Sequence, residues 1–194
     1  MENSVQNSWG ASLLASANSF AKLENGTAVF STVEPHLSQS GNNGLRLTFS
    51  HPKYSDDSSK RHYEYVSASQ ADRLNRTMER LRYMFVYADN AEANVAFSQI
   101  PYPFADVVDD NGEIVYANSE EELKSIKANN ADIEFLNIST SKWKAVRWNV
   151  DKEQIIASIK NALNCLVDTR CELKFEDNEK GFPKLVRISK FKQS

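Results

Sequence analysis

The stretch that decides the fold lies in the last third of the chain, where residues 141–192 read SKWKAVRWNVDKEQIIASIKNALNCLVDTRCELKFEDNEKGFPKLVRISKFK. Residues 142–150 interleave tryptophans with basic residues, which predicts an amphipathic β-strand. Residues 171–175 and 185–191 are two further segments that predict closing strands. Between the tryptophan strand and the segment 171–175, Asp151 caps a helix whose apolar stripe has helical spacing: Ile155, Ile159, Leu163 and Leu166.

The first residues predict a different kind of structure. Residues 1–8 are polar and we expect a flexible tail there. Residues 9–23 place Trp9, Leu13 and Phe20 on one helical face, while the other face carries serine and asparagine. Such a helix is a weak former alone, so we expect it to dock on the body or to bind a partner chain. Residues 9–194 are predicted to form one domain.

The middle of the chain predicts a mixture of short strands and helices. One strong helix spans 69–85, with Leu74 and Leu81 in its buried stripe. Residues 90–103 end in Pro-Tyr-Pro, which neither a helix nor a central strand accepts, and no element is predicted there. Other local patterns predict strands at 27–33, 45–49, 62–66 and 133–138, a hairpin at 104–117 with a type I′ turn at Asn111-Gly112, and a short helix opened by Ser119 and Glu122.

This grouping of strands and helices predicts the α+β class. We expect a largely antiparallel sheet, or a partly open barrel of the oligonucleotide-binding type, with two strong amphipathic helices and one or two shorter ones.

Composition restricts the function. The net charge is only −3, so any contact with nucleic acid must come from a local basic patch. Two cysteines and three scattered histidines predict neither a disulfide framework nor a metal site, and the glycines form no phosphate-binding loop, so no cofactor is expected. The N-terminal residues lack the features of a secretory leader, and no apolar run is long enough for a bilayer, so we expect a soluble cytoplasmic protein without membrane attachment.

The strongest candidate site combines aromatic and basic side chains, a pattern typical of surfaces that bind single-stranded nucleic acid. Strand alternation places Trp143 and Trp148 on opposite faces, so at most one of them stacks on a base while the other packs in the core. Both tryptophans packing in the core is an equally weighted alternative. The predicted nucleic-acid-binding residues are Trp143, Trp148, Lys142, Lys144, Arg147, Arg187, Lys190, Arg73, Arg76 and Arg80.

We therefore expect a non-enzymatic protein that binds single-stranded nucleic acid, encoded by a phage or mobile element because no familiar cellular motif is present. A protein-interaction module, such as a virion component, a homo-oligomer or an inhibitor of a host nucleic-acid enzyme, is the alternative. It is motivated by an acidic segment at 106–122 and a basic one at 180–192. A third hypothesis is a metal-dependent nuclease, because Glu172 and Lys174 form an E-x-K pair on one strand face, although cross-strand charge pairing also explains them.

Overall fold

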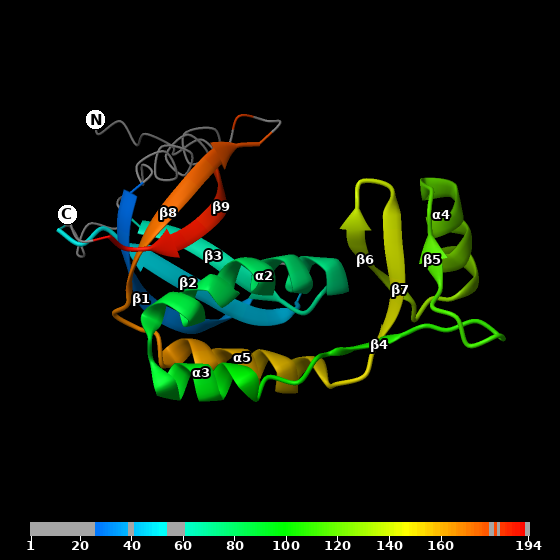
Figure 1. The fold of residues 1–194 in the computed structure, drawn as a ribbon, viewed down its shortest axis with the longest axis horizontal. Coiled ribbons are helices and arrows are strands. Elements are labelled where there is room, and N and C mark those ends of the chain that lie inside the picture. Colours follow the sequence, from blue (N-terminus) through cyan, green and yellow to red (C-terminus); the bar gives the residue numbers. More distant parts are fainter. Residues whose placement is uncertain (1–25, 39–40, 54–60, 179–180, 182, 193–194) are drawn as a thin grey trace, which may run out of the picture.

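The computed structural model describes residues 26–38, 41–53, 61–178, 181 and 183–192, so the predicted tail at 1–8 and helix at 9–23 lie outside the described residues. Within those residues the chain forms four helices and nine strands, arranged in two antiparallel sheets (Figure 1). The α+β prediction is confirmed, and neither sheet closes into a barrel over the described strands. None of the described helices is long and apolar enough to span a membrane.

The larger sheet is built from β1 (Gly26–Leu37), β2 (Asn43–Ser50), β3 (Arg61–Ser67), β8 (Arg170–Asp177) and β9 (Pro183–Lys190). These strands are all antiparallel neighbours in the order β3-β2-β1-β8-β9. The sheet therefore joins the first described strand to the last hairpin, with Thr27 directly opposite Glu172. Its core face is set by alternation, as in β2, where Leu45, Leu47 and Phe49 are buried.

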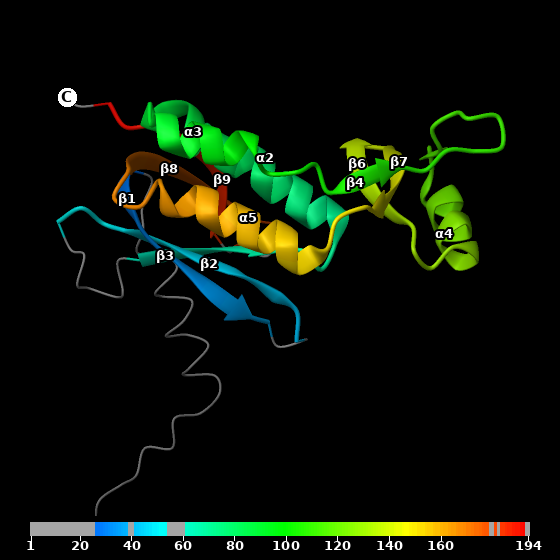
Figure 2. The same cartoon turned by 90° about the horizontal axis from the view of Figure 1, so that it is seen from below.

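Three helices cover one face of this sheet: α2 (Ala71–Ala88), α3 (Ala91–Ser98) and α5 (Lys152–Asn164) (Figure 2). The Asp151 cap is confirmed, because its carboxylate accepts the backbone N–H groups of Glu153 and Gln154 at 2.8 and 3.0 Å. The main core lies between these helices and the sheet and includes Phe30, Leu47, Phe49, Leu74, Leu81, Ile159 and Leu163.

Helix α3 was not predicted. It lies wholly before Pro101, and Asn90 caps it by accepting the Ala93 N–H at 3.1 Å. Its eight residues are too few to show a clear helical period, and the two prolines dominate the sequence pattern of this region.

Strand β7 (Lys142–Trp148) is the central strand of the smaller sheet. On one edge β7 pairs with β6 (Glu134–Ser139), and on the other it pairs in turn with β4 (Phe104–Asp106) and β5 (Tyr116–Ala117). Helix α4 (Glu120–Asn129) begins at the predicted Ser119 cap, whose hydroxyl accepts the Glu122 N–H at 3.2 Å. A second apolar cluster forms here from Val107, Ala117, Ile133, Phe135 and Ala145.

The loop between β4 and β5 does not have the predicted turn type. Gly112 has φ +81°, but Asn111 is not among the residues with positive φ. A type I′ turn needs positive φ at both positions, so that prediction is wrong. Instead, the Asp109 carboxylate accepts the N–H groups of Asn111 and Glu113, both at 2.9 Å, and holds a four-residue loop. These backbone bonds lower the pKa of Asp109.

Glu134 on β6 joins the smaller sheet to α2. One carboxylate oxygen accepts the indole N–H of Trp148 at 2.7 Å, and the other accepts the backbone N–H of Ala71 at 2.5 Å. Gln70 makes no side-chain cap, so this carboxylate accepts the free N–H of Ala71 and places a negative charge at the positive dipole end of α2. Glu134 therefore fixes the smaller sheet against the first turn of α2.

Candidate binding surface

The two tryptophans of β7 lie on opposite faces, as strand alternation predicts, and both are half-buried. Trp148 packs on the main core, with its ring centroid 4.9 Å from that of Phe104, and the Lys152 ammonium lies 4.5 Å from its centroid. Trp143 packs on the second cluster and lines a cavity of about 340 Å³ together with two acidic side chains, Asp72 and Glu134. Each tryptophan thus anchors β7 to a different core.

The basic residues of β7 have local partners. Lys144 pairs with Asp106 at 2.7 Å, and this hydrogen bond raises the pKa of Lys144. Arg147 pairs with Asp132 at 2.5 Å. Lys142 lies over the ring of Tyr116, 4.2 Å from its centroid. These contacts reduce the charge that the strand offers to a phosphate.

The three predicted arginines of α2, Arg73, Arg76 and Arg80, do not form a row of free cations. Arg76 pairs with Asp72 one turn earlier on the helix. Arg80 pairs with Glu64 of β3 at 3.0 Å and its side chain is only 24% exposed, so it ties α2 to the sheet. Arg73 remains exposed and lines a separate cavity of about 210 Å³ with Tyr65.

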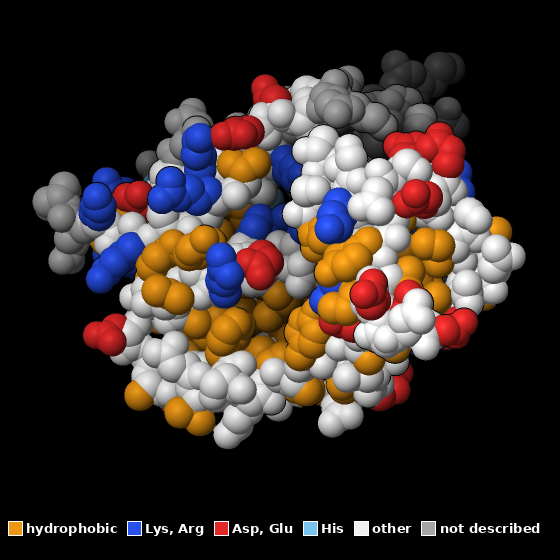
Figure 3. All heavy atoms as spheres, turned by 45° about the vertical axis from the view of Figure 1, so that its right-hand side comes forward, with side chains coloured by type: hydrophobic (Ala, Val, Ile, Leu, Met, Phe, Trp, Pro, Cys, Tyr) orange, Lys and Arg blue, Asp and Glu red, His pale blue; other side chains and the backbone are white. Residues whose placement is uncertain are grey.

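Arg187 and Lys190 lie in a larger groove on the last hairpin, with a volume of about 710 Å³. We call it the basic groove, and its lining residues are Gly26, Tyr87, Glu172, Leu173, Lys174, Arg187, Ser189, Lys190 and Lys192. Lys174 pairs with Glu176 at 2.7 Å, but among the described residues no carboxylate lies within salt-bridge distance of the other three cations. Figure 3 shows Lys and Arg side chains gathered toward the left of the molecule.

The alternation of β8 and β9 builds this groove. Cys171 and Leu173 are buried against the core, so the residues between and after them, Glu172 and Lys174, face the other way. Pairing of the two strands brings Lys174 opposite Arg187. Four cations and one acid therefore line the same groove.

Tyr87 connects the basic groove to α2. Its hydroxyl donates to the backbone carbonyl of Ile188 at 3.1 Å, which holds the end of the helix against β9. Burial raises the pKa of Tyr87, and the positive charge of Arg187 partly opposes this effect. Tyr87 also stacks on Tyr83, with ring centroids 6.0 Å apart, and Tyr83 is 41% exposed.

The E-x-K pair lies in this groove, but its neighbours do not complete a nuclease-type acid pair. Across the sheet, Glu172 faces Thr27 on β1 and Ser189 on β9. No cluster of three His, Cys, Asp or Glu side chains that could hold a metal ion occurs among the described residues.

The structure thus separates the ten predicted residues into distinct surfaces. Strands β7 and β9 belong to different sheets, so the tryptophan strand and the closing strand do not form one surface. The tyrosines that border the basic groove were not predicted, although their i, i+4 spacing on a helix is a readable signal for a surface pair.

No protein-family model matches this chain, and no curated protein matches it in sequence.

Proposed function

We propose that this chain is a non-enzymatic, cytoplasmic binding protein for single-stranded nucleic acid, and that the strand's phosphates lie in the basic groove. The observation that supports this most strongly is the excess of four cations over one acid in that groove. Basic side chains in a groove attract the phosphate backbone and release its counterions, which favours binding without sequence preference.

The aromatic side chains at the edge of the groove favour a single strand over a duplex. Tyr87 lines the groove, and the exposed ring of Tyr83 lies next to it. Unpaired bases stack on such rings, whereas bases in a duplex are already stacked on each other. The proposal therefore combines phosphate attraction on β8 and β9 with base stacking at the end of α2.

The test is fluorescence anisotropy with a labelled oligothymidylate at low salt. The double variant Arg187→Ala/Lys190→Ala should bind roughly 5- to 30-fold more weakly, because each exposed charge contact contributes about 0.5–1 kcal/mol. The matched variant Lys142→Ala/Arg147→Ala removes the same charge from β7, where these side chains already have partners, and should change affinity less than twofold.

Two results would contradict the proposal. A wild-type protein that does not bind the oligonucleotide at low salt refutes the function. If only the Lys142→Ala/Arg147→Ala variant loses affinity for the oligonucleotide, the binding site lies on β7 and the groove assignment is refuted. Circular dichroism of each variant shows that the fold is retained.

A second candidate function is protein–protein association through the acidic loop. Val108 and Ile114 form a bridge there and both side chains are exposed, within a segment, 106–122, that carries acidic but no basic residues. An exposed apolar pair in an acidic segment matches a partner with basic and apolar side chains, including the basic groove of another copy. Sedimentation at low and high salt should then show a salt-sensitive oligomer that Val108→Asp weakens; a monomer at both salt concentrations contradicts head-to-tail association.

A further inference from the structure

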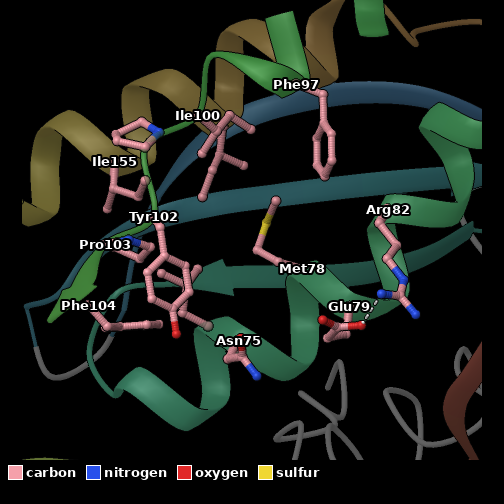
Figure 4. A pocket seen from close by; sticks show the side chains of 13 residues that line it. Asn75, Met78, Glu79, Arg82, Phe97, Ile100, Tyr102, Pro103, Phe104 and Ile155 are labelled. Atoms are coloured by element: carbon pink, nitrogen blue, oxygen red, sulfur yellow. Dashed lines mark ion pairs between the residues drawn. The ribbon is translucent and has the colours of Figure 1, made fainter. Parts of the chain in front are cut away.

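An apolar pocket lies between α2, α5 and the segment that follows α3. Its volume is about 260 Å³. In Figure 4, Met78 points from α2 toward Phe97 and Ile100, while Tyr102 lies across from Asn75. Tyr102 is 57% exposed, so its ring forms an accessible wall rather than part of the packed core.

The mouth of the pocket carries polar groups. Glu79 and Arg82 line it and pair with each other at 2.8 Å, as the dashed line in Figure 4 marks. Asn75 and Tyr102 also line the pocket, and they carry a polar amide and a polar hydroxyl. Apolar walls with hydrogen-bonding groups at the rim are complementary to a flat ring that has polar edges, such as a nucleobase.

A chain of side-chain contacts along α2 links the pocket to the basic groove. Arg82 lines the pocket, and its guanidinium lies 5.1 Å from the ring centroid of Tyr83. Tyr83 stacks on Tyr87, which lines the basic groove. Figure 3 shows the hollow lined by hydrophobic side chains below and to the right of the gathered Lys and Arg side chains.

The distance between the pocket and the basic groove can be spanned by a short stretch of nucleic acid. Met78 and Tyr87 are nine residues apart on one helix, about 14 Å along its axis at 1.5 Å per residue, and the two and a half turns between them place them on opposite sides of the helix. The path around the helix is therefore longer than 14 Å, and at about 3.4 Å per stacked nucleotide it takes more than roughly four nucleotides.

We propose that the pocket receives one unpaired base of the strand whose phosphates lie in the basic groove, with Tyr102 as the stacking wall. This inference rests on the proposed function. It adds a second base contact to the stacking on Tyr83 and Tyr87 beside the groove, and it strengthens the distinction between a single strand and another polyanion.

The first test compares oligothymidylate with an abasic deoxyribose-phosphate oligomer of the same length, again by anisotropy. Wild-type protein should bind the base-bearing strand at least roughly 5-fold more tightly, because one stacked base contributes about 1–3 kcal/mol, a factor of roughly 5 to 160. Tyr102→Ala should lower that preference at least roughly 5-fold and leave affinity for the abasic oligomer unchanged, whereas Tyr102→Phe should retain it. Ile138→Ala is the control, because Ile138 is an exposed apolar side chain on β6, outside this pocket.

The second test uses the methionines, of which the chain has three. With methyl-¹³C-labelled methionine, the Met78 signal should shift when oligothymidylate is added, because this side chain lines the pocket. Met84 is buried in the core and its signal serves as an internal reference. The abasic oligomer should leave the Met78 signal in place.

The outcomes separate the two proposals. A Tyr102→Ala variant that keeps the wild-type preference for oligothymidylate, or a Met78 signal unaffected by oligothymidylate, overturns the pocket inference while the groove variants still test the function. Binding of neither oligomer by the wild-type protein overturns both. An equal Met78 shift with both oligomers also contradicts the inference, since the pocket then responds to phosphate and not to a base.

Discussion

Glu134 should contribute a large share of the stability that holds the smaller sheet against α2. Its carboxylate accepts from the Trp148 indole at 2.7 Å and from Ala71 N–H at 2.5 Å, and its side chain is 28% exposed. Glu134→Ala leaves both partly buried donors without this acceptor, and each lost charge-assisted bond costs about 1–2 kcal/mol. We therefore expect the free energy of unfolding to fall by about 2–4 kcal/mol. Glu134→Gln keeps an acceptor oxygen but loses the charge at the helix N-terminus, so a fall of about 1–2 kcal/mol is expected.

Urea denaturation followed by tryptophan fluorescence and circular dichroism measures both changes. Asp132→Ala is the matched control, because Asp132 also accepts from a β7 residue but its side chain is 67% exposed. An exposed ion pair contributes no more than about 1 kcal/mol, so this variant should remain close to wild type. A Glu134→Ala variant within about 0.5 kcal/mol of wild type would refute the assigned role of this carboxylate.

Four further predictions follow from burial and backbone geometry. At pH 8 a thiol reagent should modify the partly exposed Cys165 and spare Cys171 until urea unfolds the chain, because burial raises the pKa of Cys171 to about 12 from 9.0. Since the native thiol keeps its proton where the unfolded one loses it, the free energy of unfolding should fall as the pH rises from about 9 to about 12. Arg80→Ala should lower the free energy of unfolding by about 1–2 kcal/mol, because it removes a half-buried pair, while Arg73→Ala changes it by less than about 0.5 kcal/mol in the same urea assay. Gly112→Ala should lower the melting temperature by a few degrees, since φ +81° costs a residue with a Cβ about 1 kcal/mol; an unchanged melting temperature contradicts the loop conformation.

Local patterns predicted most individual elements, because caps and periodicity act over a few residues. Asp151 and Ser119 begin helices where the sequence places them, and the alternation of β2 matches its buried face. Which strands become neighbours depends on contacts between distant residues. Strand β1 pairs with β8, so Thr27 meets Glu172, and no local pattern encodes that pairing.

The candidate site was predicted only in part for the same reason, because its partners come from distant parts of the chain. The carboxylates that pair with Lys144 and Arg147 belong to Asp106 and Asp132, which lie on other segments of the chain. Sequence alone identified the cations but not these partners. Arg187 and Lys190 lie together in the basic groove, yet their aromatic neighbours come from α2 instead of the tryptophan strand.

The salt dependence of oligothymidylate binding tests the central claim most directly, because it counts phosphate contacts. Each contact with a single strand contributes about −0.7 to the slope of log K against log salt. Lys174 is paired with Glu176, so the other three groove cations predict a slope of about −2.1. Affinity should then fall roughly 20-fold between 50 and 200 mM salt. For Arg187→Ala/Lys190→Ala the slope should be about −0.7 and the fall roughly threefold. Equal slopes for the two proteins would contradict the assignment of the basic groove as the phosphate-binding surface.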